Sequence, residues 1–209
     1  MKRTAAVWVF VAAIGACSKP PHPPPSAATP ASTPRAGDAS AAPGRVAGKI
    51  HAGGTAVVVL EPKTARTFPA QTNTPMMDQV GLTFGPELLL VRTGQPVEFR
   101  NNDDTLHNVH VTHEETRTPA FNVAIPTGSS YRYTFELDGF YRVGCDIHPA
   151  MAASVFAATT PYTAVAESDG SFTFFDVPSG TWTVTVYTGG KRLHKDVEVK
   201  GGVTEVTID

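Results

Sequence analysis

From about residue 44 to the end of the chain, short apolar runs alternate with polar positions and are separated by Gly, Pro, Asn and Asp. This pattern is typical of β-strands joined by turns, and no segment carries the helical period of about 3.6 residues. The predicted strands are Arg45–Ile50, Ala56–Glu61, Gln79–Phe84, Leu88–Arg92, Pro96–Arg100, His107–Thr112, Ser130–Glu136, Tyr141–Gly144, Ala153–Ala157, Thr163–Glu167, Phe172–Phe175, Trp182–Thr188, Leu193–Val199 and Thr204–Ile208. Residues 113–129 are expected to form a loop with one strand near Phe121–Ile125. The pattern as a whole predicts all-β sandwiches or barrels.

The beginning of the chain has a different character. Lys2 and Arg3 precede an apolar run from Ala5 to Ala16, which is too short to span a bilayer. A cationic start followed by a short apolar run is typical of a secretory signal peptide, here expected over residues 1–16. We therefore expect a protein exported from a bacterial cytoplasm.

The apolar run ends at Ile14-Gly15-Ala16-Cys17, which resembles a bacterial lipobox. Cleavage there would leave Cys17 as a lipid-carrying first residue, whereas an ordinary signal peptide with an incidental cysteine is the alternative. Residues 17–44 are rich in Pro, Ala, Ser and Thr and are expected to form a disordered tether. Ser18 after the cysteine, rather than Asp, favours the outer membrane over the inner one, so we expect a periplasmic protein held at the outer membrane through Cys17.

The most informative segment is Cys145-Asp-Ile-His-Pro-Ala-Met151, in which a thiol, an imidazole and a thioether occur at C-x2-H-x2-M spacing. The chain has only two cysteines, so a lipidated Cys17 would leave Cys145 without a disulfide partner. Thiolate and imidazole ligands with a weak thioether suit a mononuclear copper site that cycles between Cu(II) and Cu(I). Cys145, His148 and Met151 are therefore candidate ligands, although a free Cys or Met can also simply fill a core.

Such a site needs a second imidazole, and His107 is the candidate because it follows a polar turn and begins a β-type run. Asn108 is expected to join the two ligand-bearing loops by hydrogen bonds. His107, His110 and His113 could suggest a further metal site, but neighbouring side chains of a strand alternate, so His107 and His110 should face opposite sides. We expect His110 and His113 to be solvated or hydrogen-bonded, and His51 and His194 to lie on the surface.

Residues 75–158 resemble the cupredoxins (plastocyanin and amicyanin). The resemblance rests on Phe84–Gly94, Val97–Asp103, the His107-Asn-Val run and the short Cys145 loop. It implies a Greek-key β-sandwich with one type 1 copper per chain, bound by His107, Cys145, His148 and Met151. It also implies that His148 reaches the surface through an apolar patch and that Met151 is a long axial ligand.

The flanking segments, 45–74 and 159–209, resemble a carboxypeptidase regulatory-like (prealbumin-like) β-sandwich. The segments that carry this resemblance are Gly44–Ile50, Thr55–Leu60, Ala166–Val186 and Val197–Ile208, with turns predicted at Asp169-Gly170 and Pro178–Gly180. We therefore expect the cupredoxin domain to be inserted in, or packed against, this second sandwich. Bacterial proteins labelled methylamine-utilisation are similar in arrangement.

The functional prediction is a blue copper protein that carries single electrons between exported redox partners through transient contacts, as a monomer. The alternative is periplasmic copper storage, sensing or delivery, against which stand the closed ligand set and the presence of only four methionines. A third possibility is a binding module in which copper is vestigial, and the intact ligands argue against it. We expect no enzymatic activity, because a multicopper or nitrite-reducing enzyme needs a further copper centre with more histidines. The formal net charge of −2 and the absence of a basic stripe argue against a nucleic-acid partner.

Overall fold

We describe the fold from a computed structural model, which covers residues 42–51 and 54–209. The described residues form strands and turns, with no helix among them, so the expected all-β class is confirmed. No helix in this part of the chain could therefore cross a membrane. The predicted signal peptide, Cys17 and the tether as far as residue 41 lie outside the described residues.

Sixteen strands are present within residues 42–51 and 54–209. They are β1 (Gly44–Ile50), β2 (Ala56–Pro62), β3 (Met76–Val80), β4 (Thr83–Gly85), β5 (Leu88–Arg92), β6 (Pro96–Asn101), β7 (His107–His113), β8 (Pro119–Ile125), β9 (Ser130–Thr134), β10 (Gly139–Gly144), β11 (Ala152–Ala158), β12 (Thr163–Val165), β13 (Ser171–Val177), β14 (Gly180–Thr188), β15 (Lys191–Val199) and β16 (Gly202–Ile208).

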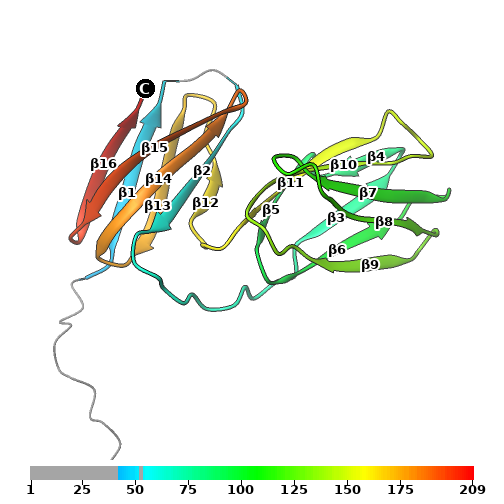
Figure 1. The fold of residues 1–209 in the computed structure, drawn as a ribbon, viewed down its shortest axis with the longest axis horizontal. Helices are drawn as coiled ribbons and strands as arrows, with labels where there is room; N and C mark the ends of the chain where they lie inside the picture. Colours follow the sequence, from blue (N-terminus) through cyan, green and yellow to red (C-terminus); the bar gives the residue numbers. More distant parts are fainter. Residues whose placement is uncertain (1–41, 52–53) are drawn as a thin grey trace, which may run out of the picture. The chain divides into compact units, whose positions relative to one another are not determined.

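Strands from the two ends of the described chain form one pair of sheets (Figure 1). The first sheet has the order β13-β1-β16 and the second the order β12-β2-β14-β15. Their apolar side chains share one buried cluster, in which Trp182 of β14 and Phe172 and Phe174 of β13 are the buried large aromatic members. The alternation of apolar and polar positions along these strands therefore places one face of each sheet in a common core.

Strands β3 to β11 form a second pair of sheets. The five-stranded sheet has the order β5-β11-β10-β7-β8, and the four-stranded sheet has the order β4-β3-β6-β9. Phe99, Phe135, Val109 and Val143 are among the residues of the cluster that both sheets bury. Cys145 and Met151 belong to the same cluster. The segment predicted to hold a metal is therefore built onto one end of a packed core.

One of the strand predictions needs correction. The single strand expected over Gln79–Phe84 is two strands, β3 and β4, because Gly81 and Leu82 form a turn with φ values of 59° and 58°. Leu82 adopts a positive φ, which is uncommon for a residue other than glycine, and its N–H donates a hydrogen bond to the Asp103 carboxylate at 2.8 Å. The one strand expected near Phe121–Ile125 within residues 113–129 is confirmed as β8, which begins at Pro119 and pairs with β7.

The predicted turn at Asp169-Gly170 is confirmed. Gly170 has φ of 83°, and a Cβ atom there would lie 2.2 Å from the Ile50 carbonyl oxygen, so only glycine fits. The Asp169 carboxylate accepts a hydrogen bond from the Ser171 N–H at 2.9 Å and faces Lys49 at 3.4 Å. These bonds, first from Ser171 and then from Lys49, lower the pKa of Asp169 from 3.8 to about 2.

A pH-dependent effect follows for Asp169→Ala. Because the folded-state pKa is lower than the unfolded-state value, the charged carboxylate stabilises the native state above about pH 4, and this contribution fades as the pH falls towards 2. We expect the variant to unfold at lower denaturant concentration than the wild type at pH 7, and the gap to shrink between pH 4 and pH 2. Urea titrations at several pH values measure it, and a gap of constant size down to pH 2 would contradict this role of Asp169.

Candidate metal centre

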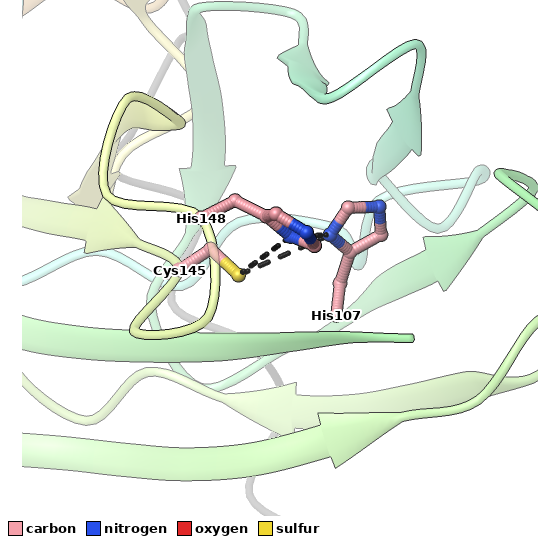
Figure 2. A group of neighbouring side chains, drawn as sticks. All are labelled: His107, Cys145 and His148. Atoms are coloured by element: carbon pink, nitrogen blue, oxygen red, sulfur yellow. Dashed lines mark hydrogen bonds between the residues drawn. The ribbon is translucent and has the colours of Figure 1, made fainter. Parts of the chain in front are cut away.

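Three side chains meet at one end of the second pair of sheets (Figure 2). The Nδ1 atoms of His107 and His148 lie 2.9 Å apart, and the Cys145 Sγ lies 3.9 Å from the first and 3.8 Å from the second. His107 and Cys145 are buried, whereas His148 is half-buried. Within residues 42–51 and 54–209, this is the only group of three or more His, Cys, Asp or Glu side chains that could hold a metal ion.

His107 is placed by the turn that joins β6 to β7. The Asn101 amide at the end of β6 donates hydrogen bonds to the carbonyl oxygens of Thr105 at 2.8 Å and Ile125 at 2.7 Å. Its Oδ1 accepts from the Asp103 N–H at 3.0 Å. One buried side chain therefore satisfies the backbone of the turn and fixes where β7 begins.

The ring of His107 is oriented by Asp103, whose Oδ2 lies 3.1 Å from the His107 Nε2. Hydrogen bonds from the Leu82 N–H and then from His107 hold the pKa of Asp103 below its ordinary value of 3.8. A charged carboxylate only accepts, so the His107 Nε2 carries the proton and its Nδ1 presents a lone pair towards Cys145 and His148. A carboxylate behind a histidine in this way fixes the tautomer that a metal requires.

The other candidate ligands come from the loop between β10 and β11. These strands are antiparallel neighbours, and Gly144 pairs with Ala152, so the loop of residues 145–151 begins and ends at the same point of the sheet. Within it, the Met151 N–H donates to the His148 carbonyl oxygen at 2.9 Å. Cys145 and Met151, the two ends of the loop, are buried in the core, while His148 lies between them and nearer the surface.

Asn108 connects β7 to this loop. Its Oδ1 accepts hydrogen bonds from the Cys145 Sγ at 3.2 Å, the Asp146 N–H at 2.7 Å and the Ile147 N–H at 3.3 Å. Its Nδ2 donates to the Asn122 Oδ1 at 2.8 Å and the Asp146 Oδ2 at 3.0 Å. One side chain thus holds the loop of Cys145 and His148 against the strand that begins with His107.

The donor set fits one copper ion. Imidazole nitrogen and thiolate sulfur bind first-row metals such as zinc at about 2.0 and 2.3 Å, so two ligands of one ion must lie less than about 4.3 Å apart. All three separations, 2.9, 3.8 and 3.9 Å, meet this limit. Two imidazoles and a thiolate in a trigonal set are what a redox-active copper site uses, with a thioether as a weak further ligand.

Comparison with known families agrees with this donor set. Residues 71–157 match the sequence profile of the copper binding proteins of the plastocyanin/azurin family. This part of the chain is a cupredoxin domain. The arrangement of His107, Cys145, His148 and Met151 in the cupredoxin domain could bind one copper.

Solved structures similar to this chain include three copper proteins. Amicyanin from Paracoccus versutus is 18% identical over 43% of this chain and 85% of its own, with a TM-score of 0.38. A purple cupredoxin from Nitrosopumilus maritimus is 21% identical over 40% of this chain and 99% of its own, with a TM-score of 0.36. A Cu-containing nitrite reductase from Thermus scotoductus is 27% identical over 47% of this chain and 25% of its own, with a TM-score of 0.38. None of the curated protein sequences matches this chain.

The remaining histidines of β7 follow the alternation of the strand. His107 and His113 are buried, whereas His110 on the opposite face is 40% exposed. The His113 Nδ1 bonds to the Thr116 hydroxyl at 2.9 Å, and its Nε2 bonds to the Asp138 carbonyl oxygen at 3.2 Å. His110 and His113 are therefore hydrogen-bonded, as expected, and neither joins the group around Cys145.

Sequence reasoning did not assign any role to Asp103, Asn122 or Asp146. The Asp146 Oδ2 accepts from the Asn122 Nδ2 at 2.8 Å, and its Oδ1 accepts from the His110 Nδ1 at 3.0 Å. These bonds, first from His110 and then from Asn122, hold the pKa of Asp146 below its ordinary value of 3.8. The spacing of Asp103 four residues before His107 was the one local signal available, because the contacts of Asp146 join segments far apart in the sequence.

We expect Asn108→Ala to loosen the loop even without metal. The variant removes the acceptor of the Asp146 and Ile147 N–H groups, and one hydrogen bond contributes about 0.5–1.5 kcal/mol to stability. The free energy of unfolding from urea denaturation should fall by about that amount. Asn122→Ala is the matched control, because the Asn122 side chain is exposed and its loss leaves those N–H groups bonded. Equal stability of the Asn108→Ala variant and the wild type would refute the proposed role of Asn108.

Proposed function

We propose that this chain is a type 1 copper protein that carries single electrons between exported redox partners. His107, Cys145 and His148 would be the strong ligands of one copper, and Met151 the weak axial ligand. The observation that carries the proposal is the convergence of two imidazole nitrogens and one thiol sulfur, within 4.8 Å of one another, at the edge of a packed core. A cysteine that only filled the core would not need two imidazole nitrogens within 4 Å of its sulfur.

The residues around the site prepare it for a metal in specific ways. Asp103 holds the proton of His107 on Nε2, so Nδ1 is available as a ligand without rearrangement. The Cys145 thiol must lose its proton on binding, and the Asn108 Oδ1 then still holds the loop by accepting hydrogen bonds from the Asp146 and Ile147 N–H groups. Copper, when bound, would supply a one-electron couple between Cu(II) and Cu(I). A sandwich that holds the ligands in place leaves little to move when the electron arrives or leaves.

His148 offers the route to a partner. It is half-buried, and its neighbour Ile147 in the loop is 47% exposed. Leu106, which precedes His107, is 48% exposed, and Pro149 and Ala150 are also exposed. Apolar side chains beside a ligand suit a small, transient contact in which water is excluded between two redox centres.

The rest of the proposal concerns location and architecture. We propose that the protein is a monomer that is exported and anchored at the outer membrane through Cys17, and export and anchoring would place the site in the periplasm. We further propose that residues 45–74 and 159–209 form a carboxypeptidase regulatory-like sandwich into which the cupredoxin domain, 75–158, is inserted. The membership of the sheets supports this division, because β3 to β11 pair only among themselves in the part of the chain described.

Copper binding gives the first test. Protein loaded with one equivalent of Cu(II) should show an intense visible thiolate band and narrow copper hyperfine splitting, because a thiolate ligand carries much of the unpaired spin. Cys145→Ser should abolish both signals. Met151→Leu should keep the band and shift the reduction potential, since Met151 is proposed as the weak ligand.

The same sample separates electron transfer from copper handling. A carrier should cycle reversibly between its two oxidation states and retain copper when a Cu(I) chelator is added in modest excess. Rapid loss of Cu(I) to the chelator would favour storage or delivery. A protein that binds Cu(II) without the thiolate band would sink the electron-transfer proposal.

The apolar surface beside His148 gives a second test, with Ile147→Gln. Burying one Ile side chain is worth about 1.5–3 kcal/mol, and about 1.4 kcal/mol is a factor of ten, so electron self-exchange between copper-loaded molecules should slow by about tenfold or more. NMR line broadening in mixtures of oxidised and reduced protein measures this rate. Val203→Gln is the control, because Val203 is 54% exposed but lies on β16. Equal slowing in both variants, or in neither, would show that electrons do not leave beside Ile147.

A further inference from the structure

We propose that Asp146 is a positioning residue for the metal centre, whose carboxylate holds the Asn108 amide in the orientation that supports Cys145. This inference rests on the function proposed above, and it concerns a side chain that binds no metal itself. Asp146 directly follows Cys145, and its side chain is 56% exposed. An exposed carboxylate normally has water as its partner, so its contacts in this structure require a reason.

The Asp146 carboxylate collects three donors from two strands. Its Oδ2 accepts from the Asn108 Nδ2 at 3.0 Å and the Asn122 Nδ2 at 2.8 Å. Its Oδ1 accepts from the His110 Nδ1 at 3.0 Å. Asn108 and His110 lie on β7 and Asn122 on β8, so the side chain of the ligand loop is fastened to both strands.

These contacts decide which way the Asn108 amide points. An asparagine side chain presents an acceptor on one side and two donors on the other, and the two ends have nearly the same shape. A carboxylate has no proton to give, so it must face the Nδ2 end. The Asn108 Oδ1 is thereby turned towards the Cys145 Sγ, the Asp146 N–H and the Ile147 N–H.

The opposite orientation would be costly at both ends. It would set the Asn108 oxygen against the Asp146 carboxylate and the Asn108 NH₂ group against the Asp146 and Ile147 N–H groups. The hydrogen bond from the Cys145 thiol to the Asn108 Oδ1 ends when the thiol loses its proton, so Asp146 acts on the metal centre by positioning the loop through these two backbone N–H groups. Without the Asp146 carboxylate, the Asn108 amide is held less firmly and both of these hydrogen bonds weaken.

Two variants of Asp146 separate position from charge. In Asp146→Asn, the new amide oxygen can accept from Asn108 and Asn122 while its NH₂ group faces the His110 ring, so the orientation of Asn108 is kept and the charge is lost. Asp146→Ala loses both. Asp104→Asn is the control for charge alone, because Asp104 is an exposed acid in the turn before His107 that does not contact Asn108.

We would measure the full chain with and without copper. Loss of a negative charge near the metal favours the reduced state, so both Asp146 variants should raise the ratio of reduced to oxidised copper at a fixed potential, by up to about tenfold, or about 59 mV for one electron. Only Asp146→Ala should also change the thiolate band and the copper hyperfine splitting. In metal-free protein, Asp146→Ala should speed hydrogen exchange of the Ile147 N–H by about tenfold relative to Asp146→Asn, as expected for one weakened hydrogen bond.

Identical spectra and identical Ile147 exchange in Asp146→Ala and Asp146→Asn would overturn the inference, because charge alone would then explain any shift. The metal-free exchange measurement keeps this result distinct from failure of the proposed function. If the wild type shows no thiolate band with copper, the electron-transfer proposal fails, yet the exchange of the Ile147 N–H still reports whether Asp146 holds Asn108.

Discussion

The metal centre depends first on the register between β7 and β10. Gly144 pairs with His110 and Val143 with Val111, so Cys145, the next residue after β10, comes to the end of the sheet where β7 begins. His107 and Asn108 are the first two residues of β7. A slip of one residue would turn Cys145 out of the core and away from His107, because successive side chains of a strand face opposite sides. The core below, with Val109, Val111 and Val143 fully buried, fixes that register.

The second constraint is the orientation of the His107 ring. Asp103 accepts a hydrogen bond from the His107 Nε2, so Nδ1 is the ring nitrogen turned towards Cys145 and His148. The two Nδ1 atoms lie 2.9 Å apart, which is close enough for both to bind one ion. The strand therefore supplies a ligand whose ring is held by a carboxylate, and the loop supplies the other candidate ligands.

Much of this arrangement could be predicted from the sequence because its signals are local. The C-x2-H-x2-M spacing lies within one loop, and the alternation of β7 predicts that His107 and His110 face opposite sides. The turn between β3 and β4 escaped prediction, because Leu82 adopts a positive φ that is uncommon for a residue other than glycine, and its N–H bonds to Asp103 in a different segment. The bonds of Asp146 to His110 and Asn122 escaped for a related reason. They form only when β7, β8 and the loop after β10 come together, and the composition of any one of these segments does not predict them.

The central claim is that a rigid sandwich presents two imidazoles and one thiolate to a copper that changes oxidation state in place. X-ray absorption at the copper edge, recorded on oxidised and reduced protein, tests it most directly. The account predicts one short copper–sulfur contact and two copper–nitrogen contacts in both states, with only small changes in length between them. Loss of the sulfur contact, or a shell of nitrogen and oxygen ligands alone in either state, would contradict it.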